Sequence, residues 1–183
     1  PRADQVHVAP DDVPELGDLV ELRALQEAPD RRVEAVARLQ EARHAPAFVV
    51  ADLTDIAALD RAIDALRQRT GPFTVLLNNA ANDQRHSIES TTSESWDAGV
   101  AVNLKHQFFA AKNVAADMKA AGGGSIVNFG SVSWKLKQGG MPVYTTSKAA
   151  VQGLTRSLAR DYGPYNIRVN TLVPGWVMTE KQV

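Results

Sequence analysis

The stretch 125–173, SIVNFGSVSWKLKQGGMPVYTTSKAAVQGLTRSLARDYGPYNIRVNTLV, decides the fold of this chain. It opens with a short run rich in β-branched and aromatic residues, Ser125 to Phe129, and closes with a second apolar run, Ile167 to Val173. Between them, Val143 to Tyr162 carries small and apolar residues at helical spacing and stops before Gly163-Pro164. This pattern predicts a strand, a helix and a strand, which together form the repeating unit of a parallel sheet.

The alternation of strand and helix continues upstream of this stretch. Five further elements are expected, in chain order: a buried strand at Ala47 to Ala51, an amphipathic helix at Ile56 to Thr70, a strand at Thr74 to Leu77, a helix capped by Thr92, and a helix from about Lys105 to Lys119. Strands that are separated by helices and apolar on both faces imply a parallel sheet covered on two sides. The sequence therefore predicts the α/β class with a doubly wound parallel sheet.

Composition excludes several other classes of protein. Lys and Arg together number 20 against 21 Asp and Glu, so no net field attracts a nucleic-acid backbone or an anionic membrane. The chain has no cysteine, which excludes disulfides, a thiolate zinc site and a cysteine nucleophile. No apolar run approaches the ~20 residues of a membrane span, and no signal-peptide pattern is visible. We expect a cytoplasmic protein that acts on a small molecule, without a metal and without nucleic-acid or membrane partners.

The sharpest chemical signal is Tyr144-Thr145-Thr146-Ser147-Lys148. A tyrosine and a lysine four residues apart on a helix lie on one face, within about 6 Å of each other. A phenol with a pKa of about 10 is a poor base at neutral pH, and each unit by which that pKa falls requires about 1.4 kcal/mol of preferential stabilisation of the phenolate. Lys148 can supply part of that stabilisation. Alone, however, the pair is weak evidence, because a solvated lysine beside a half-buried tyrosine meets the same pattern by chance.

Two further polar residues strengthen the interpretation of this pair as a catalytic site. Ser131 lies thirteen residues before Tyr144, just past a predicted strand, where its hydroxyl could bind the same substrate oxygen. Asn103 completes a set of four polar residues. A helix-interior asparagine satisfied by the backbone is an equally good interpretation of Asn103 alone.

From about Val33 to its end, the chain resembles the short-chain dehydrogenase/reductase family, with motifs in the family's order and spacing. Asn103, Ser131, Tyr144 and Lys148 match the catalytic tetrad of that family. The resemblance implies that Tyr144 is the acid/base and that Ser131 orients the substrate oxygen. It also implies that Lys148 holds the nicotinamide ribose and lowers the pKa of Tyr144, while Asn103 anchors a proton-relay water. A Rossmann-like fold, NAD or NADP as cofactor, and assembly as a homodimer or homotetramer are implied as well.

The same resemblance implies a set of cofactor contacts. Asp52-Leu53 resembles the family's adenine-contacting pair. The stretch 78–81 resembles its Asn-Asn-Ala-Gly turn under the cofactor ribose, with Ala81 in place of the usual glycine. The segment from Pro174 onward resembles the loop that cradles the carboxamide and pyrophosphate. The implied cofactor-binding residues are Asp52, Leu53, Asn79, Ala80, Ala81, Tyr144, Lys148, Pro174, Gly175, Val177 and Thr179.

A narrower resemblance bears on the substrate. The stretches 78–86, 103–109 and 128–134 are similar to bacterial aldose 1-dehydrogenases, which act on xylose, galactose, arabinose or fucose and release a lactone. Polar side chains after a strand suit such a substrate, because open α/β sheets bind ligands at the carboxyl ends of their strands. The implied substrate contacts are Asp83, Arg85, His86, Ser133 and Trp134.

Several alternatives stay open at this point. Arg85 and His86 could form a solvated loop, and Trp134 could fill space under the substrate loop. A reductase of ketones on acyl or steroid substrates shares the tetrad but not the loop 82–86. A protein of a different class, a non-catalytic fragment, would keep only the fold and self-association through the helices at 105–119 and 143–162.

The chain departs from the family at both ends. The family opens with a strand and a Thr-Gly-x-x-x-Gly-x-Gly loop, whose glycines let backbone N–H groups approach the pyrophosphate. Nothing before Asp52 resembles this loop, and Gly17 is the only glycine there. We expect an irregular segment at 1–30 and, at 31–183, a Rossmann-like dehydrogenase domain that lacks the first βα unit and the C-terminal part.

These departures lead to a prediction about cofactor binding. If the glycine-rich loop is truly absent from the protein, and not merely outside this sequence, the bare 183-residue polypeptide is expected to bind NADH and NADPH only weakly and to show negligible turnover, because the pyrophosphate loses its backbone donors. Fluorescence titration of the purified chain measures this directly. Binding in the micromolar range would show the expectation to be wrong.

Overall fold

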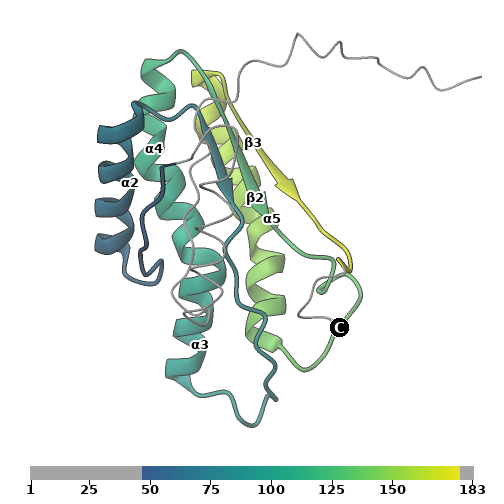
Figure 1. Ribbon diagram of the computed structural model, residues 1–183. Coiled ribbons are helices and arrows are strands. Elements are labelled where there is room, and N and C mark those ends of the chain that lie inside the picture. Colours follow the sequence, from purple (N-terminus) through teal and green to yellow (C-terminus); the bar gives the residue numbers. More distant parts are fainter. Residues whose placement is uncertain (1–46, 178–183) are drawn as a thin grey trace, which may run out of the picture.

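The computed structural model describes residues 47–177 of the chain (Figure 1). Its elements are, in order, α2 (Ile56–Thr70), β1 (Val75–Asn78), α3 (Ser93–Val100), the π-helix η1 (Ala101–Lys105), α4 (His106–Ala120), β2 (Gly124–Phe129), α5 (Pro142–Tyr162), the 3-10 helix η2 (Gly163–Tyr165) and β3 (Ile167–Leu172). These confirm the helices and strands expected from residue 56 onward, to within a few residues at each end. The irregular segment expected at 1–30 lies outside the described residues.

The three strands form one parallel sheet in the order β1-β2-β3. Its register pairs Asn78 with Asn128, and Asn128 with Thr171. The predicted α/β class with a parallel sheet is therefore confirmed.

The predicted strand at Ala47 to Ala51 is wrong. Within 47–51 only Phe48 makes an isolated bridge, and no ladder forms. β-branched and aromatic residues favour an extended backbone, but a strand also needs a neighbour along its hydrogen-bonding edge. Among the described residues β1 pairs only with β2, so the ladder of this sheet does not reach the segment.

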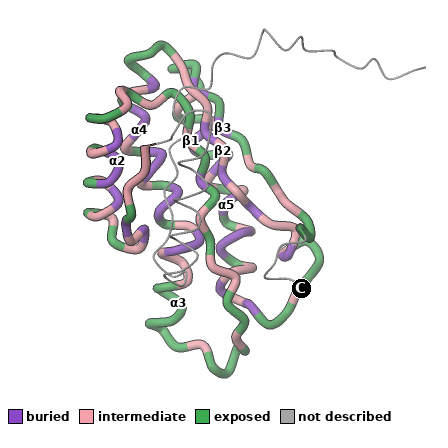
Figure 2. The backbone as a smooth tube through the Cα atoms, viewed as in Figure 1, coloured by how far each residue is buried: buried purple, intermediate pink, exposed green. Residues whose placement is uncertain are grey.

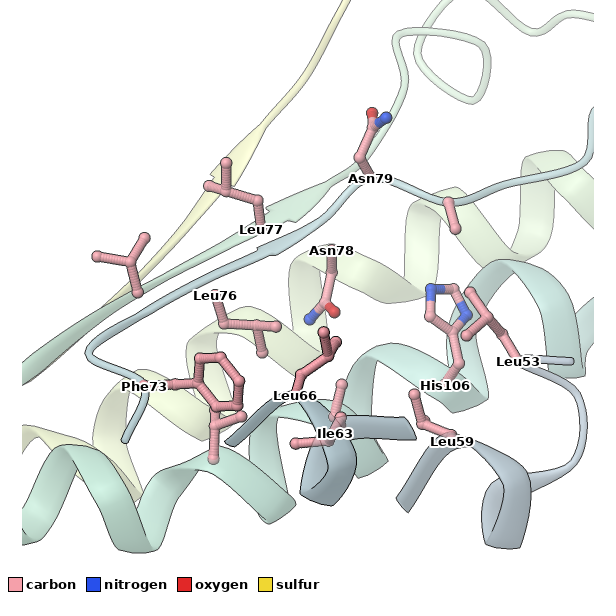
Figure 3. A pocket seen from close by; sticks show the side chains of 14 residues that line it. Leu53, Leu59, Ile63, Leu66, Phe73, Leu76, Leu77, Asn78, Asn79 and His106 are labelled. Carbon is pink, nitrogen blue, oxygen red and sulfur yellow. The ribbon is translucent and has the colours of Figure 1, made fainter. Parts of the chain in front are cut away.

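The helices that contact the strands in the described part of the chain pack on one face of the sheet. Asn78 bonds the backbone of α4 and Asn128 bonds Thr155 of α5, and these two asparagines face the same side. The close-up in Figure 3 shows Leu76 and Asn78 pointing toward the helices and Leu77 pointing away from them. On that far face the side chain of Leu77 remains 50% exposed.

The apolar core lies between this inner face and the helices, where the buried residues gather in Figure 2. Its centre comprises Leu53, Leu59, Ile63, Ala110, Ala111, Val114, Met118, Ile126, Leu158, Ile167 and Val169. Polar contacts add to this packing between α2 and α4, where Arg67 Nε donates to Asp117 Oδ2 at 2.8 Å and Arg67 Nη2 to Asn113 Oδ1 at 2.7 Å. Helix α2 is thereby held against α4 by both apolar packing and a branched hydrogen-bond network.

Local capping explains where two of the helices begin. Asp55 Oδ1 accepts from the backbone N–H groups of Ala57 and Ala58, the first-turn donors of α2 that have no partner within the helix. Thr92 and Ser95 form a reciprocal capping box at the start of α3. The cap predicted at Thr92 is confirmed.

A buried ladder of amides and hydroxyls crosses the sheet at the carboxyl ends of its strands. Asn78 Nδ2 donates to Asn128 Oδ1 at 2.8 Å and to the Gln107 carbonyl of α4 at 3.2 Å. Asn128 Nδ2 donates to Thr155 Oγ1 at 3.0 Å, and Thr155 Oγ1 lies 2.7 Å from Thr171 Oγ1. The ladder ties all three strands to α4 and α5 directly beneath the strand ends.

Replacing Asn128 with leucine is expected to lower the free energy of unfolding by about 1–3 kcal/mol. Leucine shares the branched shape of asparagine but is larger, so the loss combines the two broken hydrogen bonds with crowding at this buried site, and no cavity is created. Urea unfolding measures it, and Asn170→Leu, on the exposed side of β3, is the matched control. Equal stability of the two variants would contradict the role given to the ladder.

Candidate active site

The candidate site lies where the three parallel strands end. Two contacts bring the segments after the strands together: Val132 N donates to the Pro174 carbonyl at 3.1 Å, and Lys148 Nζ donates to the Phe129 carbonyl at 2.7 Å. The first contact joins the loops that follow β2 and β3. The second anchors α5 to the end of β2, so that residues distant in sequence meet at one edge of the sheet.

Tyr144 and Lys148 occupy the first turns of α5, as their spacing predicts. The Lys148 Nζ lies 5.7 Å from the centre of the Tyr144 ring. Lys148 is only 1% exposed, and this burial lowers its pKa to about 8. The ammonium is still mostly protonated at pH 7, and a cation beside a phenol favours the phenolate.

Ser131 lies on the bend after β2. Its Oγ accepts from Ser133 N at 3.1 Å, which orients the hydroxyl within the loop. Gly130 precedes it at a point where a Cβ would lie 3.1 Å from Thr171 Cγ2 and 3.3 Å from Gln152 Nε2. A small residue at position 130 thus lets β2 end close to β3 and α5, with Ser131 immediately beyond.

Asn103 is buried within the π-helix η1, a type of element that is frequent at functional sites. Its Nδ2 donates to the carbonyls of Asn82 and Gly99, at 3.0 and 2.9 Å. Its Oδ1 accepts from Asn82 N at 2.9 Å. The side chain therefore fastens the loop that follows β1.

A polar cavity of about 200 Å³ contains two members of the predicted tetrad, Asn103 and Tyr144. It lies between the loop after β1, the helices α3 and η1, and the start of α5. Its lining comprises Asn82, Gln84, His86, Ser90, Ser95, Ala98, Gly99, Val102, Asn103, Val143 and Tyr144. Besides His86, six of the eleven lining residues carry amide or hydroxyl groups, so the cavity has possible hydrogen-bond partners on several sides.

A second, mainly apolar cavity of about 60 Å³ lies between α2, β1 and α4 (Figure 3). It brings together three of the predicted cofactor contacts, Leu53, Asn79 and Ala80. His106 also lines it; this residue is 2% exposed, and among residues 47–177 neither ring nitrogen has a hydrogen-bond partner of good geometry. Burial, together with the charge of Lys148, lowers the pKa of His106 to about 4, so the ring is neutral at pH 7.

The remaining predicted cofactor contacts are more dispersed. Asp52 Oδ1 accepts from the backbone N–H and the hydroxyl of Thr54, at 2.9 and 2.8 Å. Ala81, Gly175 and Val177 are exposed, and Pro174 is half-buried. Thr179 lies outside the described residues.

Of the predicted substrate contacts, only His86 lines the cavity that holds Tyr144. Asp83 is half-buried and Arg85 is exposed. Ser133 is 2% exposed, and its buried Oγ has no hydrogen-bond partner, as is also true of Trp134 Nε1. These two residues lie on the loop after β2, beside Ser131.

The loop 82–86, which the sequence placed near the substrate, contributes Asn82 and Gln84 as well as His86 to the cavity lining. Sequence reasoning missed other residues that the structure places at the site: His106 faces the apolar cavity, and the pair Asn128 and Thr155 supports the strand ends. A signal was available for Asn128, since an asparagine inside a strand between Val127 and Phe129 requires a buried partner. For His106 no local pattern distinguishes a site residue from a core histidine.

Comparison with known proteins identifies the class of this protein. The family model of the short chain dehydrogenases matches residues 18–183. The chain belongs to this family.

Within this family, the chain is similar to two sugar dehydrogenases. A protein of Rhizobium meliloti named probable galactose dehydrogenase GalD is 48% identical over 138 residues, which are 75% of this chain and 54% of that protein. The D-xylose 1-dehydrogenase of Caulobacter vibrioides is 43% identical over 137 residues, again 75% of this chain and 54% of that protein. The chain thus spans about half the length of these relatives.

Solved structures agree with the fold. A gluconate 5-dehydrogenase from Burkholderia cenocepacia, in complex with NADP and tartrate, has a TM-score of 0.76 at 30% identity, over 88% of this chain and 62% of that one. A short-chain dehydrogenase/reductase variant from Serratia marcescens has a TM-score of 0.79 at 32% identity, over 90% and 66%. The expected Rossmann-like architecture and the expected family are both confirmed.

Residues 47–177 lack two features. No helix there is long and apolar enough to cross a membrane. Within the same range, no group of three or more histidine or acidic side chains is arranged to bind a metal ion.

Burial of Lys148 has a measurable consequence for stability. With a pKa of about 8 in the folded chain against 10.5 for an ordinary lysine, the unfolded chain binds more protons between these pH values, and stability rises with pH. Lys148→Met is therefore expected to be more stable than the wild type at pH 7, by up to about 3 kcal/mol.

This gain should shrink as the pH rises from about 8 to about 10.5. Urea unfolding across this pH range measures the difference, with the exposed Lys112→Met on α4 as the baseline. A gain for Lys148→Met that stays constant with pH would contradict the argument.

Proposed function

We propose that the protein is an NAD(P)-dependent oxidoreductase that oxidises a sugar hydroxyl by transferring hydride from the anomeric carbon that bears it to the dinucleotide, converting an aldose to a lactone. The observation that carries this proposal is the shared polar cavity of Tyr144 and Asn103, with the buried Lys148 cation next to the phenol. A base, its activating cation and a polar binding cavity are the elements that alcohol oxidation requires.

The residues present fit a nicotinamide dinucleotide. An ammonium carries three donor hydrogens, and the bond from Lys148 to the Phe129 carbonyl accounts for one, which leaves donors for ribose hydroxyls. Leu53, Asn79 and Ala80 line one cavity, as expected for a turn under the cofactor, and the buried His106 beside them has unpartnered nitrogens. When bound, the dinucleotide supplies the hydride acceptor. The choice between NAD and NADP stays open.

The roles that we assign to the chain's own residues rest on the family resemblance of the tetrad and on the contacts described above. Ser131 holds the substrate oxygen with its hydroxyl, and Tyr144 takes the proton from that oxygen as the hydride leaves the carbon. The charge of Lys148 stabilises the phenolate before it accepts this proton. Asn103 holds the loop that forms one wall of the cavity and, in the family's manner, would anchor a relay water.

A sugar is favoured as the substrate by the chemistry of the cavity. A polyol needs donors and acceptors on several sides, and the lining around Tyr144 supplies the amides of Asn82 and Gln84 and the hydroxyls of Ser90 and Ser95. An acyl or steroid substrate would require an apolar cavity at the phenol instead. The similarity to a galactose dehydrogenase and a xylose dehydrogenase supports the same choice.

We also propose that the protein is cytoplasmic and assembles as a homodimer or homotetramer through α4 and α5. Phe108 on α4 is 41% exposed, and an aromatic ring in that position suits burial against a second copy.

Substitution of Tyr144 by phenylalanine is expected to reduce kcat at least about 100-fold, because proton transfer by a positioned side chain contributes about that much or more. NAD- and NADP-linked oxidation of an aldose panel, run beside hydroxyacyl and steroid alcohols, measures it. Tyr165→Phe on η2 is the matched control. Undiminished turnover in Tyr144→Phe would disprove the catalytic assignment, and preference for the acyl or steroid alcohols would disprove the sugar.

A further inference from the structure

We propose that His86 is a positioning residue that caps the first turn of α5 and completes a strut between Asn103 and Tyr144. The strut is the segment Asn82–His86, which follows β1 and its Asn-Asn turn. The effect of His86 on catalysis rests on the proposed function of Tyr144. The structural role of His86 is supported separately, by the hydrogen bonds described below.

The strut begins at a reciprocal contact. Asn103 Oδ1 accepts from Asn82 N at 2.9 Å, and Asn103 Nδ2 donates to the Asn82 carbonyl at 3.0 Å. Two antiparallel bonds between one side chain and one residue's backbone fix position as well as orientation. Because Asn103 is 2% exposed, little water competes for these bonds.

The strut continues through Gln84 to His86. Asn82 Oδ1 accepts from Gln84 N at 3.1 Å, and the Gln84 carbonyl lies 2.9 Å from His86 Nδ1. A carbonyl oxygen only accepts hydrogen bonds, so this contact requires a proton on Nδ1. We infer the tautomer that carries its lone pair on Nε2.

That lone pair faces the start of α5. Val143 N donates to His86 Nε2 at 3.5 Å, and His86 N donates to the Gly140 carbonyl at 3.0 Å. The helix provides no side-chain cap of its own, since its N-cap residue is Met141. Pro142 at the first helical position has no N–H, so Val143 carries the first donor that needs an acceptor.

The cap is adjacent to the phenol. Val143 is 3% exposed and packs so closely on α3 that a Cβ at Gly99 would lie 2.5 Å from Val143 Cγ1. Tyr144 is the next residue and lines the same cavity as His86. A shift of the first turn of α5 therefore moves the phenol relative to Asn103.

This role differs from direct contact with a sugar. Both ring nitrogens of His86 are engaged with backbone groups, Nδ1 at Gln84 and Nε2 at Val143. The ring thus holds the cavity wall in place, and the hydrogen-bonding groups that face the cavity come from its neighbours in the lining.

The test compares His86→Leu, which removes the acceptor, with His86→Gln, whose amide oxygen restores it. Ser87→Ala, in the same exposed loop, is the matched control. Amide hydrogen exchange at Val143 reports the cap directly. His86→Leu is expected to accelerate this exchange about two- to thirtyfold, the range that loss of a helix cap produces. Both His86→Gln and the control should stay near the wild-type rate.

Two spectroscopic readouts accompany the exchange measurement. The chain has only three tyrosines, so labelled tyrosine NMR with Tyr144→Phe as the assignment variant follows the ionisation of the Tyr144 phenol. His86→Leu should shift this titration, and His86→Gln should restore it. The chain also has only four histidines, and ¹⁵N spectra of the wild type should show the His86 proton on Nδ1.

The outcomes separate this proposal from the proposed function. Unchanged exchange at Val143 in His86→Leu, or a wild-type ring protonated at Nε2, overturns the strut whatever the activity. A raised KM with unchanged kcat and exchange would make His86 a sugar contact instead, which also overturns the strut. Faster exchange in a protein that oxidises no alcohol would support the strut and defeat the proposed function.

Discussion

A buried ladder of side-chain hydrogen bonds holds the strand ends of this protein in one register. Asn78, Asn128 and Thr171 lie opposite one another on adjacent strands, and Thr155 joins them from α5. A shift of one strand by a single residue would turn these polar groups to the other face and leave their partners buried without hydrogen bonds. Because α5 also carries Tyr144 and Lys148, to which we assign catalytic roles, the register of the sheet determines where these two residues lie.

At the site beside this ladder, the charged ammonium of Lys148 lies in a buried environment that disfavours charge. Lys148 is buried without a carboxylate partner among residues 47–177, and its bond to the Phe129 carbonyl is the contact that holds it there. His106 is buried close enough that the lysine charge helps to keep its ring neutral. Apolar side chains at these two positions would avoid the cost of removing polar groups from water. The fold is therefore less stable with Lys148 and His106 than it would be with apolar residues in their place. Such a cost is expected where a cation must stand beside a phenol.

Sequence reasoning recovered the fold wherever local pattern and tertiary neighbours agreed. The helix Ile56–Thr70 has the bounds that the sequence predicted. Its apolar periodicity ends where the local signals lie, with the cap Asp55 at its start and Gly71 after its end. The strand expected at 47–51 failed because β-propensity does not supply a partner strand. At the site, the four-residue spacing placed Tyr144 near Lys148, but the spacing could not decide between two equal interpretations of Asn103. The structure shows this amide bonded to backbone groups alone, to the Gly99 carbonyl one turn earlier and to Asn82 in the loop after β1, as the structural interpretation expected.

What the sequence determined by itself is therefore the order of the elements, the parallel α/β class and the pairing of a phenol with an ammonium on one helix. These follow from periodicity, which acts over a few residues. Only the tertiary structure decided that Asn82, Gln84 and His86 bridge Asn103 to the start of α5, and that His106 is buried without a partner. The contacts at the two ends of this bridge join residues that are 21 and 57 positions apart in the chain. Their geometry depends on how the strands and helices pack, and no local pattern encodes it.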